Sequence, residues 1–191
     1  MKKLTLSVAA VMAMSTFASA DINDPGGYIG LGYSYMSTSM KVPSLGTAEA
    51  TGNAITFTTG YQANDYFALE VRYSTTFGDL DGEDFDGSTG DIEGDMSNIA
   101  IYAKPMYKIN ELSLYGLIGY GMVTLGDDYF SDTDSESGFQ WGLGTSYSIK
   151  SNIDISIDYT KLYDDAGGFG NSEEGNNIDI DSLTFGVNYK F

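Results

Sequence analysis

The sequence predicts an all-β fold, an eight-stranded antiparallel up-and-down barrel that crosses a membrane, from three observations. Large apolar residues alternate with small or polar ones, with period two, in eight segments from residue 28 onward. Short and long connections between these segments alternate strictly. The 191 residues include 24 Gly, 15 Tyr and 10 Phe but only three Pro, a composition typical of β-structure rather than of helices.

The first 20 residues have the pattern of a secretory signal peptide. Lys2 and Lys3 precede a short uncharged apolar segment, and the stretch ends in the small residues Ala18, Ser19 and Ala20. A membrane anchor is the alternative, but the run is too short to span about 30 Å of hydrocarbon. We therefore predict a signal peptide at residues 1–20 and one outer-membrane β-barrel domain at residues 21–191.

The charge of the mature chain excludes some partners. Without Lys2 and Lys3, seven basic residues remain against 27 acidic ones, which gives a net charge of −20. Such a surface repels phosphate, so we expect no nucleic acid partner. The chain has no cysteine, so the exported domain must be stable without disulfides. No later apolar run has the length of a membrane-spanning helix, so any span must consist of strands.

The predicted strands carry different residues on their two faces. In the first, Ile29 and Leu31 lie on one face, and Gly30 and Gly32 lie on the other. Pro105 should interrupt the fourth strand because it has no N–H to donate. The eight strands are predicted at 28–37, 53–61, 66–75, 97–107, 112–125, 138–149, 153–162 and 178–191.

The fifth strand and the last need separate comment. The alternation is least regular at 112–125, where we place Gly119 and Gly121 on the inner face. In the last strand one face carries only large apolar residues: Leu183, Phe185, Val187, Tyr189 and Phe191. Because a strand that ends the chain needs an edge to pair with, we expect it to pair with the first strand and close the barrel.

The connections orient the barrel. Three are short, at 62–65, 108–111 and 150–152, and four are long, at about 38–52, 76–96, 126–137 and 163–176. An even number of strands puts both termini at the end with the short turns. This is the layout of an outer-membrane barrel with periplasmic turns and long external loops.

Period two alone does not say which face meets lipid. A soluble lipocalin-like barrel that binds a ligand would turn its apolar face inward. Here the other face is mostly Gly, Ser, Thr and Ala with few charges, which suits the narrow lumen of eight strands better than contact with water. We therefore predict an outward apolar face, with Tyr and Trp in belts at the two membrane interfaces.

These features resemble a known family. The signal peptide, the eight strands, the segments at 114–121 and 153–159 and the terminal Tyr189-Lys190-Phe191 resemble small outer-membrane barrels of the OmpA/OmpX and opacity-porin type. The resemblance implies location in the outer membrane and recognition of the final strand, with Tyr189 and Phe191, by the barrel-assembly machinery. We expect no peptidoglycan-binding domain, unlike full-length OmpA.

Catalysis is not expected. The chain has neither histidine nor cysteine, which excludes Ser-His and Cys-His nucleophilic sites. Asp154 and Asp158 share the inner face but lie four residues apart on a strand, about 13 Å, which is too far for a carboxylate pair. We predict no catalytic residues and no cofactor.

The inner face carries six charged residues that form a candidate lumen network: Glu70, Arg72, Lys104, Asp154, Asp158 and Lys190. One interpretation is structural, because buried charges must be paired and would then plug the barrel. The alternative is a polar pathway for a small solute. The structural interpretation predicts that Glu70→Ala or Arg72→Ala lowers the unfolding temperature without altering conductance.

The predicted external loops are acidic. Seventeen of the 27 acidic residues fall in the last three long connections, where they repel one another. Asp84, Asp86 and Glu93 match part of an EF-hand calcium loop, but the first ligand position is Gly82 and no helices flank it. A solvated acidic loop is therefore the preferred interpretation. Weak association of divalent cations, bridging to lipopolysaccharide phosphates, is a further expectation.

Three functions remain open from the sequence. The leading one is an outer-membrane protein with a structural or adhesin-like role, whose acidic loops contact an unknown surface ligand. The second is a narrow channel for small solutes. The third is the soluble ligand-binding barrel.

Overall fold

The computed structural model describes residues 25–42, 46–85, 87–92, 94–126, 133–165 and 177–191. The signal peptide predicted at residues 1–20 lies outside these ranges and stays a prediction. Within them, no helix is long and apolar enough to cross a membrane.

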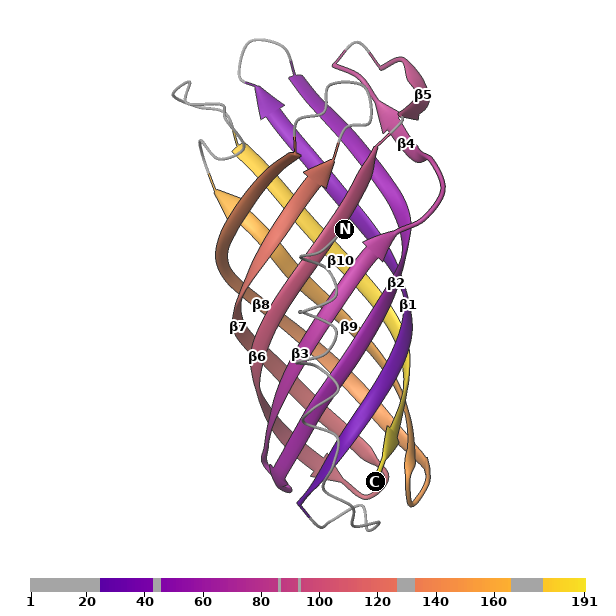
Figure 1. Cartoon of the computed structure of the whole chain (residues 1–191), viewed down its shortest axis with the longest axis vertical. Coiled ribbons are helices and arrows are strands. Elements are labelled where there is room, and N and C mark those ends of the chain that lie inside the picture. The colour runs from indigo at the N-terminus through magenta and orange to yellow at the C-terminus, as the bar shows by residue number, and fades with distance from the viewer. Residues whose placement is uncertain (1–24, 43–45, 86, 93, 127–132, 166–176) are drawn as a thin grey trace.

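Eight tilted strands form a closed barrel, and a further two-stranded hairpin extends one end of its wall (Figure 1). The barrel strands are β1 (Gly26–Val42), β2 (Gly46–Asn64), β3 (Phe67–Thr76), β6 (Asp95–Ile109), β7 (Leu112–Gly126), β8 (Thr133–Lys150), β9 (Ile153–Asp165) and β10 (Asn177–Lys190). The hairpin consists of β4 (Leu80–Glu83) and β5 (Thr89–Ile92). Neighbouring strands are antiparallel, which confirms the predicted fold class.

The last strand closes the barrel as predicted. β10 pairs with β1 from Tyr28↔Lys190 to Lys41↔Asn177, while the other edge of β1 pairs with β2. The Phe191 N–H then donates to the Gly27 carbonyl at 3.0 Å. The short turns and the C-terminus lie at one end, the periplasmic end, and the hairpin lies at the external end (Figure 1).

The two faces of the wall are as different as the alternation predicts. On β10 the side chains of Leu183, Phe185, Val187 and Tyr189 are 39–53% exposed on the outside, whereas Thr184 is buried inside. Because a lipocalin-like barrel would bury these apolar side chains, the soluble alternative is wrong. The outward apolar band is the surface that meets lipid.

Two finer predictions are also confirmed. Gly119 and Gly121 face the lumen, where an added Cβ would meet the side chains of Tyr102 and Gln140. The β6–β7 pairing is interrupted around Pro105, which has no N–H to donate.

Glycines make room for the large side chains of the lumen. Three buried tyrosines on inward positions lie directly opposite a glycine of the neighbouring strand, where a Cβ would collide with the tyrosine ring. The three pairs are Tyr28–Gly60, Tyr102–Gly119 and Tyr115–Gly144. The many inward glycines are thus spaces for rings in a lumen too narrow for two bulky neighbours.

The predicted boundaries of the long loops are wrong at the external end. β1 and β2 stay paired as far as Val42↔Gly46, so most of 38–52 is strand. The segment 76–96 contains the hairpin β4–β5, and β8 and β9 extend to Thr133 and Asp165. The expected pattern of apolar residues outside and polar residues inside disappears there, because the outer face becomes polar while inner positions such as Met36, Ile178 and Ile180 become apolar. The backbone ladders nevertheless continue.

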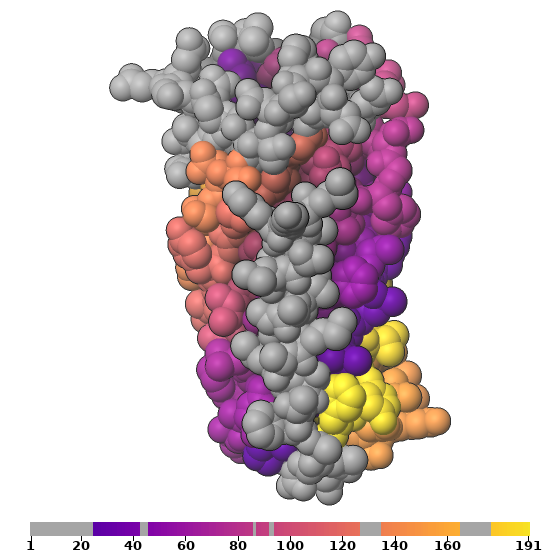
Figure 2. All heavy atoms as spheres, viewed as in Figure 1, coloured from indigo at the N-terminus to yellow at the C-terminus, as the bar shows by residue number. Residues whose placement is uncertain are grey.

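The outward face changes from apolar to polar partway along the strands. On β1 the outward series passes from Leu31, Tyr33 and Tyr35 to Ser37 and Ser39. On β10 it passes from Leu183 to Asp181 and Asp179. The wall therefore projects past the lipid-facing band, and the whole body is longer along the barrel axis than across it (Figure 2).

Candidate functional site

Four of the six predicted lumen charges form one buried cluster, here called the central cluster: Glu70, Arg72, Lys104 and Asp158. Glu70 and Arg72 are two residues apart on β3 and therefore point to the same side. Lys104 comes from the adjacent strand β6, and Asp158 comes from β9, which is not a neighbour of β3 in the sheet. The cluster therefore ties together strands that share no backbone hydrogen bonds.

Arg72 lies at the centre of the cluster. Its Nε is 2.5 Å from Glu70 Oε1, and its Nη1 and Nη2 donate to the two carboxylate oxygens of Asp158 at 2.6 and 3.0 Å. Lys104 Nζ donates to Glu70 Oε2 at 2.8 Å. Two acids and two bases leave no net charge in this buried layer.

Tyrosines complete the hydrogen bonding of the two acids. The Tyr28 hydroxyl donates to Glu70 Oε2 at 2.6 Å, and the Tyr115 hydroxyl donates to Asp158 Oδ2 at 2.7 Å. Lys104 Nζ lies 4.1 Å from the centre of the Tyr115 ring, within cation–π range. Each buried charge is thus paired and hydrogen-bonded, the condition under which charges persist away from water.

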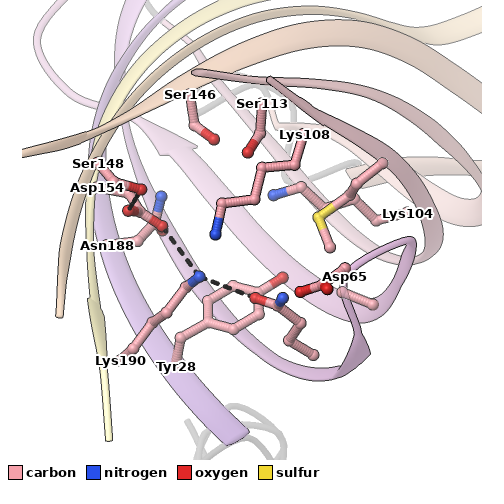
Figure 3. A pocket seen from close by; sticks show the side chains of 13 residues that line it. Tyr28, Asp65, Lys104, Lys108, Ser113, Ser146, Ser148, Asp154, Asn188 and Lys190 are labelled. Carbon is pink, nitrogen blue, oxygen red and sulfur yellow. Dashed lines mark hydrogen bonds and ion pairs between the residues drawn. The ribbon is translucent and has the colours of Figure 1, made fainter. Parts of the chain in front are cut away.

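The other two predicted charges lie apart, near the periplasmic rim. Lys190 Nζ is 3.4 Å from Asp154 Oδ2 and donates to Gln62 Oε1 at 2.8 Å. Ser148 donates to Asp154 Oδ1 at 2.6 Å. Figure 3 shows this pair on the wall of a cavity of about 30 Å³, into which Lys108 also points. The cavity has the size of a water site and is too small for a solute.

A polar layer that the sequence analysis did not identify lies beside the central cluster, toward the external end. Gln140, fully buried, accepts a hydrogen bond from the Tyr102 hydroxyl and donates to Asn98 Oδ1 at 2.8 Å. Ser34 and Thr56 exchange a further hydrogen bond at 2.5 Å. Period two can place such residues on the inner face, but it carries no information about which of them meet across the lumen.

Further toward the external end the lumen becomes apolar. This apolar layer consists of Met36, Ala54, Leu80, Met96, Val123, Leu162, Tyr163, Ile178 and Ile180. The prediction of small and polar residues on the inner face is wrong for this layer. A signal was present, because Ile178 and Ile180 share the face of Thr184, which faces the lumen.

The layers together leave little space through the barrel. Side chains of the polar layer, the central cluster and the apolar layer are almost completely buried, including Glu70 and Tyr102 at 1% exposed and Met36 and Ile180 at 0%. The lumen is filled with interlocking side chains, as expected for eight strands.

The other predicted site residues lie at the two ends. Tyr189 is outward and half-exposed, with its ring edge-on to that of Phe191 at 5.4 Å between centroids. Asp84 begins the β4–β5 turn, where its backbone carbonyl accepts a hydrogen bond from the Gly87 N–H at 2.9 Å. Asp86 and Glu93 lie outside the described residues, so the solvated acidic loop stays a prediction and calcium binding stays its untested alternative.

The chain matches one known protein family along almost its whole length. The family model described as "Outer membrane protein beta-barrel domain" matches residues 6–191. No curated protein sequence matches the chain.

Solved structures with the same fold include three outer-membrane proteins. The first is AlkL in lipid bilayers, with a TM-score of 0.60, 18% identity, and coverage of 92% of this chain and 94% of AlkL. Neisserial surface protein A has a TM-score of 0.58 and 18% identity over 88% of this chain and 99% of its own. Ail of Yersinia pestis, in complex with a heparin analogue, has a TM-score of 0.51 and 17% identity over 87% and 99%. At these identities the likeness extends to the fold alone.

Proposed function

Since the chain belongs to the outer membrane protein β-barrel domain family, we propose that it is a closed barrel of the outer membrane that acts through its external end. The observation that carries this proposal is the filled lumen. If no solute passes through the barrel, the part that meets the environment is the polar wall and the acidic connections beyond the lipid-facing band. A structural or adhesin-like contact at the cell surface is the function this arrangement suits.

We propose no catalytic activity for this protein, and a limited set of partners. The absence of histidine and cysteine argues against nucleophilic catalysis, and the carboxylates of the central cluster are buried and already paired with Arg72 and hydrogen-bonded to tyrosines. The partners proposed are outer-membrane lipid and lipopolysaccharide, divalent cations held loosely by the external acids, and the assembly machinery at Tyr189 and Phe191. A surface ligand completes the set.

That ligand is not expected to be a polyanion. Ail was solved with a heparin analogue, which is a sulfated and strongly negative molecule. The mature chain here carries a net charge of −20, and most of its acids lie in the external connections. Like charges across an interface are repulsive, so a neutral or basic partner fits this surface better.

The channel alternative is tested by conductance. The purified protein in a planar bilayer is expected to give no stable single-channel currents, because the central cluster and the apolar layer block the lumen in series. Glu70→Ala is expected to leave the barrel non-conducting, since the apolar layer remains. Reproducible currents whose size changes in Glu70→Ala would show that the barrel is a channel.

The surface role is tested on cells. Gram-negative cells that display the full chain are expected to adhere to epithelial monolayers several times better than cells displaying a variant in which residues 81–91 are replaced by a short Gly-Ser turn. The turn joins the paired residues Leu80 and Ile92, so Leu80 stays in the apolar layer. Insertions and deletions at external loops leave such scaffolds folded. The control carries Ser151→Ala and Asn152→Gly in a periplasmic turn and should adhere like the unaltered chain. Equal adhesion of displaying and non-displaying cells would contradict the role.

A further inference from the structure

The hairpin β4–β5 continues the barrel wall and ends in a strand edge. β4 pairs with the external part of β2, from Glu49↔Glu83 to Thr51↔Asp81, and β5 pairs with β4. β5 is last in the strand order, and no strand in the described part of the chain pairs with its other edge. Unpaired N–H and C=O groups at such an edge are a template for another extended segment.

One face of the three strands β2, β4 and β5 forms two rows of side chains, here called the acidic face. The first row is Glu49, Glu83 and Thr89, and the second is Thr51, Asp81 and Asp91. The six residues line a cleft of about 360 Å³ together with Gly82 and Gly90. Of the six residues of the acidic face, all except Thr51 are exposed, and the lining of the cleft includes no basic residue.

The registers place like charges directly opposite each other. Glu49 faces Glu83 across β2 and β4, and Asp81 faces Asp91 across β4 and β5. Like charges directly opposite each other on neighbouring strands destabilise the pairing. Two such pairs side by side favour a partner that brings positive charge to this face.

The spacing of the carboxylates favours several cations over one metal ion. Within the described ranges, no group of three or more acidic side chains is placed to hold a metal. Side chains on adjacent strands are about 5 Å apart, and those two residues apart on one strand are about 7 Å apart. Ammonium or guanidinium groups carried on an extended chain have this spacing.

We propose that the edge of β5 binds an extended basic peptide segment as an additional strand, with lysine or arginine at alternate positions over the acidic face. A strand added beside β5 points every second side chain to the side of Thr89 and Asp91. Basic side chains at those positions neutralise Asp91 directly and extend toward Glu83 on the next strand. This inference rests on the proposed surface role and names the class of its partner.

Fluorescence anisotropy with the purified full chain in non-ionic detergent tests the proposal. The probe is a labelled peptide of about nine residues in which lysine and threonine alternate. An isomer with contiguous lysines and an analogue N-methylated at alternate amides are the comparison peptides. The alternating peptide should bind at least about tenfold tighter than either, because only it combines registered charges with backbone hydrogen bonds. Equal affinity of the isomer or of the methylated analogue would overturn strand addition.

Two variants with the same change in charge test the location. Substituting the four acids of the acidic face by amides, as E49Q, D81N, E83Q and D91N, should weaken the alternating peptide at least about tenfold. Amides at four described acids outside the acidic face, D95N, E111Q, E136Q and D164N, should change affinity by less than about threefold. Equal weakening by both would mean attraction by net charge and would overturn the site. Adhesion of cells without peptide binding refutes this inference alone, whereas peptide binding without adhesion refutes the proposed surface role.

Discussion

Replacing Arg72 with alanine is expected to lower the free energy of unfolding of the barrel by about 3–5 kcal/mol. The substitution leaves Glu70 with Lys104 as its remaining cation, and it leaves Asp158 with none. Asp158 is 2% exposed, so its charge cannot be transferred to water without opening the wall. The Arg72→Ala substitution also removes the two hydrogen bonds from the Arg72 guanidinium to Asp158, which join β3 to β9 on the opposite side of the lumen.

Urea titration in detergent, followed by the fluorescence of Trp141, measures this loss. Lys161→Ala is the matched control, because Lys161 pairs with Asp179 and Asp181 at 3.0 Å on the outer wall, where the side chains are partly exposed. A partly exposed pair of this kind is worth about 1 kcal/mol or less. Arg72→Lys should fall between the two, since an ammonium keeps the charge but cannot bind both Asp158 oxygens. An Arg72→Ala barrel as stable as the Lys161→Ala barrel would mean that the central cluster is structurally dispensable.

The part of this barrel inside the membrane could be predicted from sequence because two solvents act on its wall. Lipid outside and a narrow lumen inside select different residues on alternate positions. A large apolar residue such as Leu183 therefore indicates the outer face, and a small polar residue such as Thr184 indicates the inner face. Closure followed as well, because an amphipathic last strand has an unpaired edge. The alternation was readable even in the fifth strand once Gly119 and Gly121 were placed inside.

The external third could not be predicted for the same physical reason. Beyond Tyr35 the outer face meets water instead of lipid, so Ser37 and Ser39 replace the large apolar residues of that face although their ladder continues. The hairpin β4–β5 has the composition of a solvated loop, and its register comes from pairing with β2 rather than from local preference. The backbone hydrogen bonds between strands therefore extend beyond the residues whose apolar–polar alternation predicts a strand.

The lumen charges were predicted as a set but not as partners. Period two places Glu70, Arg72, Asp154 and Asp158 on the inner face, and that placement agrees with the structure. The alternation gives no information on the tilt and stagger of the strands. These determine that Asp158 pairs with Arg72 and that Asp154 pairs with Lys190. Contacts across a lumen depend on closure of the whole barrel.

Gly144→Val is expected to cost about 3 kcal/mol or more, or to prevent folding, because it overfills the lumen at the central cluster. A Cβ on Gly144 would lie 2.5 Å from the Asp158 Cβ and 2.6 Å from the Tyr115 ring. Neither neighbour can move freely, since the Tyr115 hydroxyl is bonded to Asp158 and Asp158 is bonded to Arg72. Heat-modifiable migration in detergent gels and urea titration measure the loss.

Gly116→Val is the matched control, one strand away on the outer face. Its Cβ would meet only Pro105 Cγ at 3.6 Å and the Gly142 carbonyl at 3.9 Å, both ordinary contacts, so it should be near neutral. If Gly144→Val and Gly116→Val destabilise the barrel equally, the effect would come from the strand propensity of glycine and not from the lack of room for a side chain.

A double mutant tests the steric reason further. Gly144→Ala combined with Tyr115→Leu should cost less stability than the sum of the single changes, because removing the Tyr115 ring frees part of the space that the Cβ needs. Such coupling would mean that the central cluster depends on glycine. Gly144 leaves room for the Tyr115 ring, and the Tyr115 hydroxyl positions Asp158 for its ion pair with Arg72 across the lumen.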